Sequence, residues 1–140
     1  MSALAEALAA AQAELPTAIE RDSQGLGYRY TSLDKLIAAT RPILTKHGLV
    51  IMQWPTTLVR GDGEGNAALV PALTTQISGA SPELEKYHDT MPLYLTDKTM
   101  QGFGAAITYA RRYAWAAALG IASEEDTDAV TVKPEDDVPF

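Results

Sequence analysis

Apolar side chains recur at intervals of three or four residues in three stretches of the chain. This spacing places them on one face of an α-helix. The predicted helices lie within residues 1–15, over residues 32–47, and from about residue 99 to residue 119. Glycines follow the second and third patterns directly, as is typical of helix ends. Pro42 interrupts the second pattern, so this helix should kink there or be followed by a second short helix.

Between the second and third helices, the pattern changes to shorter apolar runs separated by turn residues. The runs "LVIMQW", "AALVPALTTQI" and "KYHDTMPLYL" predict three strands, with "RGDGEGN" and "SGASPE" as the loops between them. Pro71 and Pro92 place these strands at sheet edges or bulges, because proline donates no ladder hydrogen bond. The predicted fold class is α+β: N-terminal helices, then a three-stranded antiparallel β-sheet followed by a long helix, which together form a β-β-β-α core.

The last predicted helix contains "ITYARRYAW" at residues 107–115, where two arginines lie between two tyrosines. On a helical wheel, its apolar positions fall within one narrow arc that should face the core. These positions are Phe103, Ile107, Ala110, Ala114, Ala118 and Ile121. Arg112 lies opposite this arc and should point away from the core, whereas Arg111 flanks the arc. Tyr109 and Tyr113 should stack one turn apart.

Charge is distributed unevenly along the chain. Residues 1–120 contain 11 acidic and 10 basic side chains, whereas residues 121–140 contain seven acidic side chains and one lysine. We therefore expect a core domain over residues 1–123 and an acidic, flexible tail over residues 124–140. The nearly neutral domain can present a basic face to an anion, although the whole chain has a net charge of −7.

Several classes of protein are disfavoured by what the sequence lacks. The absence of cysteine excludes disulfides and thiolate metal sites, and it fits a cytoplasmic location. No apolar run approaches the ~18 residues that a membrane helix needs. His47 and His88 lack a metal-like partner spacing, the acidic run at 124–128 is followed by no histidine, and no Walker-type phosphate loop occurs. We therefore expect no enzyme, no metal, no cofactor and no membrane partner.

Longer stretches of the chain resemble a known family. The segments "YRYTSLDKLI", "RPILTKHGL" and "MQGFGAAITYARRYAWAAALGIASEEDTD" are similar, in order and spacing, to the essential recombination function (ERF) family of phage single-strand annealing proteins. Gly104 and Ala105 depart from the usual Gly-Ser pair, and the loop after the second strand is longer and less basic. The resemblance covers residues 28–128. It implies an ATP-independent protein that coats single-stranded DNA as an oligomeric ring or filament and anneals complementary strands, in phage recombination within the bacterial cytoplasm.

Sequence-independent binding of single-stranded DNA requires cations for the phosphates and aromatic faces for the bases. The stretch "YRY" at residues 28–30 and the cluster on the last helix contain both kinds of residue. The predicted DNA contacts are Tyr28, Arg29, Tyr30, Arg41, Lys46, Gln101, Tyr109, Arg111, Arg112 and Tyr113. The alternatives are structural: the tyrosines pack against neighbouring elements, and Arg111 pairs with Asp97 or Glu124.

Self-association is expected of a small domain that anneals long strands, because many nucleotides must be held at once. Leu4, Leu8 and Leu15 share one face of the alanine-rich N-terminal helix. This face is a candidate contact between the subunits of a homo-oligomer. The alternative function is a single-stranded DNA-binding or adaptor protein that protects DNA and recruits partners without annealing.

The end of the chain, "KPEDDVPF", resembles the C-terminal tip of bacterial single-stranded DNA-binding proteins. Phe140 offers an aromatic ring and a free carboxylate, and it follows a proline and two acidic residues. These groups suit a basic and apolar pocket on another protein. The predicted partner-binding residues are Asp136, Asp137, Val138, Pro139 and Phe140. The expected partners are host proteins that bind such a tip, or a phage exonuclease. The alternatives are that the tail covers Arg111 and Arg112 of its own chain, or that the ending is chance.

Overall fold

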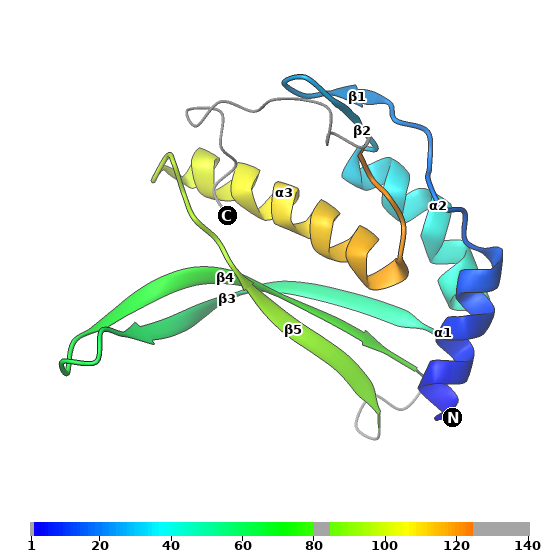
Figure 1. Ribbon diagram of the computed structural model, residues 1–140, viewed down its shortest axis with the longest axis horizontal. Helices are drawn as coiled ribbons and strands as arrows, with labels where there is room; N and C mark the ends of the chain where they lie inside the picture. The colour runs from blue at the N-terminus through cyan, green and yellow to red at the C-terminus, as the bar shows by residue number, and fades with distance from the viewer. Residues whose placement is uncertain (1, 80–84, 125–140) are drawn as a thin grey trace.

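The computed structural model describes residues 2–79 and 85–124 of the chain. Its elements, in chain order, are α1 (Ala3–Glu14), β1 (Ser23–Gln24), β2 (Arg29–Tyr30), α2 (Leu33–Lys46), β3 (Val50–Gly61), β4 (Ala67–Ser78), β5 (Lys86–Pro92) and α3 (Met100–Leu119). Strands β3, β4 and β5 form one antiparallel sheet in that order, and β1 and β2 form a separate short hairpin. Helix α3 lies across one face of the sheet, and α1 and α2 lie at one end of it (Figure 1). The predicted α+β fold with a β-β-β-α core is confirmed.

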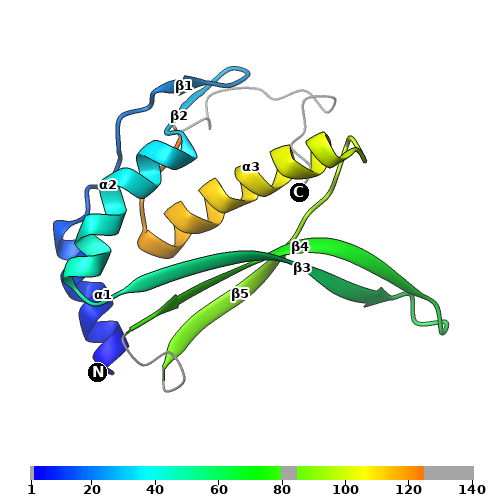
Figure 2. The same ribbon diagram turned by 180° about the vertical axis from the view of Figure 1, so that it is seen from behind.

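The strands of the sheet differ in length. Strands β3 and β4 pair over their whole lengths without interruption, whereas β5 pairs with β4 only over residues 72–78. The outer parts of β3 and β4 therefore extend beyond α3 as a two-stranded ribbon (Figure 2). Strand β3 is longer than predicted, because it continues through Pro55 to Gly61.

Prolines lie at the borders of the sheet. Pro55 is in β3, which is an edge strand, and Pro92 ends β5, which is the other edge strand. Pro71 lies in β4 just outside the part that pairs with β5. Edge positions tolerate proline because one side of the strand has no partner to bond. The predicted edge position is confirmed for Pro92. For Pro71 the prediction is wrong, because β4 is the central strand and no bulge interrupts its register; Pro71 is tolerated there because it lies beyond the last residue of β4 that pairs with β5.

The two faces of the sheet have different surroundings. Residues that lie directly opposite each other in an antiparallel pair point to the same face, and successive residues alternate between faces. Leu73 and Ile77 of β4 pack with the helices in the two apolar clusters, so odd-numbered residues of β4 face the helices. Even-numbered residues face the opposite way, and no described helix lies over that face (Figures 1 and 2).

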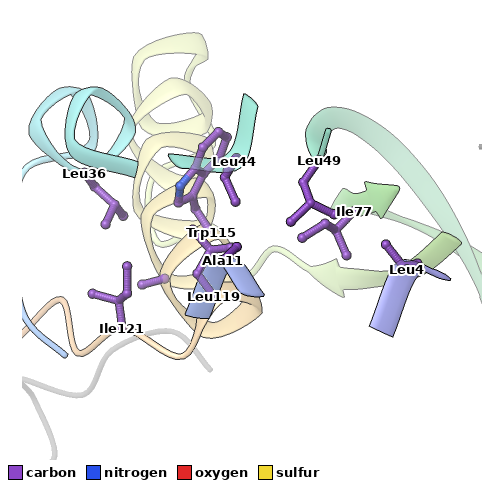
Figure 3. Packing of buried hydrophobic residues seen from close by; sticks show 10 residues of the cluster. Leu4, Ala11, Leu36, Leu44, Leu49, Ile77, Trp115, Leu119 and Ile121 are labelled. Atoms are coloured by element: carbon purple, nitrogen blue, oxygen red, sulfur yellow. The ribbon is translucent and has the colours of Figure 1, made fainter. Parts of the chain in front are cut away.

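The main apolar core joins the three helices to one end of the sheet (Figure 3). Inside it, the indole N–H of Trp115 donates to the hydroxyl of Thr40 at 2.9 Å, which satisfies two polar groups. Leu4 and Ala11 of α1 are 3% and 1% exposed. Helix α1 therefore closes the core of its own chain, and the expectation that its leucine face contacts another subunit is wrong.

The ends of the helices follow from local chemistry. The hydroxyl of Thr99 accepts a hydrogen bond from the N–H of Gly102 at 3.0 Å and begins α3, while Gly120 ends it with φ 72°. A side chain at Gly102 would collide with the carbonyl oxygen of Asp97, so α3 packs tightly on the loop before it. Helix α2 continues through Pro42 as a single helix. The second short helix considered there does not form.

Candidate nucleic-acid interface

The residues that follow α3 run back along the N-terminal part of the chain. The N–H of Ala122 donates to the carbonyl of Thr17 at 2.9 Å, and the N–H of Thr31 donates to the carbonyl of Ser123 at 2.8 Å. These bonds hold residues 121–124 between the segment before β1 and the end of β2. A side chain at residue 124 is thereby placed next to α3.

Glu124 forms an ion pair with Arg112 of α3. Nη1 of Arg112 lies 2.6 Å from Oε1 of Glu124, and Arg112 is only 5% exposed. The guanidinium carbon lies 4.2 Å from the ring centroid of Tyr30, 4.9 Å from that of Tyr113 and 5.2 Å from that of Tyr109. We call these five residues the Arg112 cluster. Aromatic faces attract cations, so the cluster ties α3 to β2 and to residue 124.

Arg112 points away from the sheet, as predicted, but it is not exposed to solvent. The helical wheel placed it opposite the residues that face the sheet, and Phe103 and Ala110 do pack toward the sheet. Strand β2 and residues 121–124 cover the other side of α3. Arg112 is buried, and its guanidinium is paired with the Glu124 carboxylate.

The tyrosines of the cluster lie in close pairs. The ring centroids of Tyr109 and Tyr113 are 4.5 Å apart, and those of Tyr28 and Tyr30 are 5.9 Å apart. The predicted contact between Tyr109 and Tyr113 is therefore confirmed, with tilted rings. Burial raises the pKa of Tyr113 far above its ordinary value, and a hydrogen bond with the Glu124 carboxylate raises this pKa further. Burial also raises the pKa of Tyr109, so both phenols stay protonated at neutral pH.

Arg111 contacts the sheet. Its Nε donates to Oε1 of Gln53 at 3.3 Å, and Nε2 of Gln53 donates to the Arg111 carbonyl oxygen at 3.1 Å. The same Gln53 nitrogen lies 3.1 Å from the hydroxyl of Thr75. Arg111 is half-buried in this network. It pairs with neither Asp97 nor Glu124, the two acids considered for it.

The other predicted contacts do not form one patch. Arg29 is exposed beside the Arg112 cluster and donates to a backbone carbonyl at 2.6 Å. Arg41 is exposed on α2 and forms no ion pair with the described residues. Lys46 is exposed at the end of α2, where it pairs with Glu14 of α1 at 2.6 Å. Gln101 is exposed in the first turn of α3, at the end of that helix far from α1 (Figure 1).

A groove of about 470 Å³ lies between the first half of α3 and residues 93–97. Its lining includes the predicted contacts Gln101 and Tyr109, together with Tyr94, which is 41% exposed. Arg60 of β3 donates to the hydroxyl of Tyr94 at 3.1 Å. The sequence did not indicate that Tyr94 and Arg60 lie together at this groove, because their contact forms only when β3 folds beside residues 93–97.

Some kinds of site are not found within residues 2–79 and 85–124. No group of three or more histidine, aspartate or glutamate side chains there is arranged to hold a metal ion. None of the helices in those two ranges combines the length and the apolar character that crossing a membrane requires. The predicted tail contacts, residues 136–140, lie outside the described residues.

Comparison with protein families identifies the chain. Residues 4–138 match the model of the ERF superfamily. The chain belongs to this superfamily. No curated protein and no solved structure matches the chain. Membership confirms the resemblance carried by residues 28–128, and it gives this ERF protein a general role in recombination and single-strand annealing.

Proposed function

We propose that this ERF protein binds single-stranded DNA and anneals complementary strands without ATP, as a homo-oligomer acting in phage recombination in the bacterial cytoplasm. The family match carries this proposal, because residues 4–138 include the whole β-β-β-α core. Annealing forms and breaks no covalent bond, so it requires DNA-binding surfaces rather than a catalytic site. The lack of a Walker-type phosphate loop in the sequence supports independence from ATP.

Exposure divides the predicted DNA contacts into two groups. Arg29, Arg41 and Lys46 are exposed cations, which supports contacts between them and phosphates. Arg112 is buried and paired with the partly buried Glu124, so we assign to Arg112 the role of positioning the tyrosines around it.

A strand-pairing assay tests the proposed activity. Two complementary dye-labelled oligonucleotides are mixed with the protein, with and without ATP, and pairing is followed by energy transfer between the dyes. An annealing protein accelerates pairing equally in both buffers. A protein that only binds and protects DNA retards pairing, and a nuclease shortens the strands when Mg²⁺ is added. The proposal fails if the protein slows pairing or if acceleration requires ATP.

The oligomer is tested separately by light scattering at micromolar concentration, with and without single-stranded DNA. A chain of 15.0 kDa should scatter as a multiple of this mass, at least when DNA is present. A monomer under both conditions would contradict the assembly.

We also propose that the tip, Asp136 to Phe140, binds a basic and apolar pocket on a host protein. Deleting residues 135–140 should leave DNA affinity unchanged and abolish capture of proteins that bind the tip of the host single-stranded DNA-binding protein. Tighter DNA binding after deletion, greatest at low salt, would instead indicate that the tail covers the DNA site of its own chain. The absence of both effects would mean that the ending is chance.

A further inference from the structure

One face of the sheet is left uncovered by the described helices (Figures 1 and 2). Gln53 of β3 bonds to Thr75 of β4 and to Arg111 of α3, so this cross-strand row faces the helices. Adjacent residues along each strand point the opposite way. We define the open face as the even-numbered residues within 50–54, 74–78 and 86–90.

The β3 edge of the open face is apolar and accessible. Val50, Met52 and Trp54 are 49%, 52% and 38% exposed. The solvated face of an antiparallel sheet usually carries polar side chains, so three large apolar side chains in succession there indicate a binding surface. Trp115, the other tryptophan of the chain, is 3% exposed. Trp54 is therefore the one tryptophan ring that a ligand can reach.

The β5 edge of the open face is basic. Lys86 and His88 are exposed there. The described acids that flank these two residues in the sequence are directed elsewhere: Asp89 belongs to the row that faces the helices, and Glu85 accepts a hydrogen bond from the N–H of Leu4 at 3.2 Å. The open face contains no carboxylate, although the chain has a net charge of −7. This separation of charge favours a polyanionic ligand.

The central strand β4 contributes small polar side chains between these edges. Thr74 and Ser78 are only 7% and 3% exposed, so their side chains do not rise above the side chains of the two edge strands. Gln76 lies between Met52 and His88 in the register. Adjacent strands are spaced by ~4.8 Å, which places the apolar and basic edges roughly 10 Å apart. Groups that stack on bases and groups that bind phosphates thus lie on opposite sides of a path along β4.

We propose that the open face binds single-stranded DNA, with bases stacked on Trp54 and packed on Met52, and with phosphates next to Lys86 and His88. The inference rests on the proposed function and assigns that function a site. Single-strand binders combine cations with aromatic stacking surfaces, and the open face has both, with no carboxylate among the residues that define it. Trp54, Met52, Lys86 and His88 were not among the DNA contacts predicted from the sequence.

Tryptophan fluorescence tests the contact directly in the full-length protein. Addition of oligo(dT) should change the emission of the protein and shield it from acrylamide, because Trp54 becomes covered. In Trp54→Phe, both changes should disappear, because the remaining Trp115 is buried. This conservative variant keeps a stacking ring, so it should still bind DNA.

Affinity provides the second measurement. Trp54→Ala should weaken oligo(dT) binding about 5- to 140-fold, the range that corresponds to one lost base-stacking contact. Lys86→Gln should reduce the slope of log affinity against log salt by about 0.7, the contribution of one phosphate contact. The matched controls are Tyr87→Ala, which removes a 52% exposed ring from the other face of β5, and Lys98→Gln, which removes an exposed lysine outside the sheet. Neither control should change the affinity or the slope.

The outcomes separate this inference from the function on which it rests. If the wild-type protein does not bind oligo(dT), the proposed function itself fails. If it binds and anneals DNA but folded Trp54→Ala binds equally well, or if saturating DNA leaves the emission unchanged, the assignment of the open face is wrong. If Trp54 is shielded without DNA and becomes accessible on dilution, the face is a contact between copies of this chain, which also overturns the assignment. Melting curves identify any variant that is not folded.

Discussion

Removal of the Glu124 carboxylate tests the Arg112 cluster most directly. The ion pair is short, at 2.6 Å, and the side chains of Arg112 and Glu124 are 6% and 18% exposed. Glu124→Ala leaves the guanidinium buried without its countercharge, and loss of one partner of a buried pair costs about 3–5 kcal/mol. The three tyrosine rings remain around the cation and offset part of this loss, by about 0.5–2 kcal/mol. We therefore expect a net loss of about 1–4.5 kcal/mol in the free energy of unfolding.

Urea unfolding and thermal melting, both followed by circular dichroism, measure this loss. For a domain of this size, each kcal/mol lowers Tm by about 4 °C, so Glu124→Ala should melt about 4–18 °C below wild type. Glu20→Ala is the matched control, because Glu20 pairs with Lys35 at 3.4 Å while the two side chains are 76% and 47% exposed. Exposed pairs contribute about 0–1 kcal/mol, so this control should melt close to wild type.

A double-mutant cycle then separates the pair from local packing. Arg112→Met removes the charge but keeps an apolar stem among the tyrosines, so the double variant with Glu124→Ala has no buried charge left. Its loss of stability should be smaller than the sum of the two single losses. The buried ion pair does not stabilise the fold as argued if Glu124→Ala is no more destabilising than Glu20→Ala. The same holds if the losses of stability in Arg112→Met and Glu124→Ala are additive.

Three further predictions address the core, the tyrosines and the salt dependence of DNA binding. Leu36 is 0% exposed, so Leu36→Ala should cost about 2–5 kcal/mol in urea unfolding, whereas Val59→Ala, at a 70% exposed position, should change stability by less than about 0.5 kcal/mol. The raised pKa of Tyr113 keeps it protonated in the folded protein, while tyrosines of the unfolded chain ionise near pH 10. The stabilisation from this residue is thus present below about pH 10 and is lost as the pH rises above that value. The midpoint urea concentration of the wild-type protein should therefore fall as the pH is raised above about 10, and it should fall less steeply in Tyr113→Phe. Arg41→Gln should lower the salt slope of DNA binding by about 0.7 if Arg41 contacts one phosphate, and an unchanged slope removes it from the site.

The order of the main elements could be predicted because their signals are local. The period of apolar residues identified the helices, and Thr99 and Gly120 cap α3 at its predicted ends. The length of β3 could not be predicted in this way. Pro55 looked like the end of a strand, and only the position of β3 at the sheet edge lets the strand continue. The β1–β2 hairpin has two residues in each strand, which is too short for a periodic pattern.

The environment of Arg112 could not be predicted because it depends on distant segments. A helical wheel finds one apolar arc, and it does not indicate that a second layer covers the opposite side of α3. Glu124 begins an acidic run in the sequence, so it was assigned to a solvated tail. Backbone bonds to residues 17 and 31 draw it back to α3. The pairing of Tyr109 with Tyr113 was predicted correctly, because residues one helical turn apart are neighbours in any helix.

The surfaces offered to DNA differ in their electrostatic surroundings. Arg29 precedes Tyr30, which bridges to Glu124. A phosphate that approaches Arg29 therefore meets the Glu124 carboxylate nearby, whereas the open face has no carboxylate. Repulsion of this kind opposes the phosphate contact at low salt and is screened as salt rises. DNA affinity at low salt should accordingly fall more in Lys86→Gln than in Arg29→Gln, and the opposite order would place the main phosphate contacts on the helix side of the molecule.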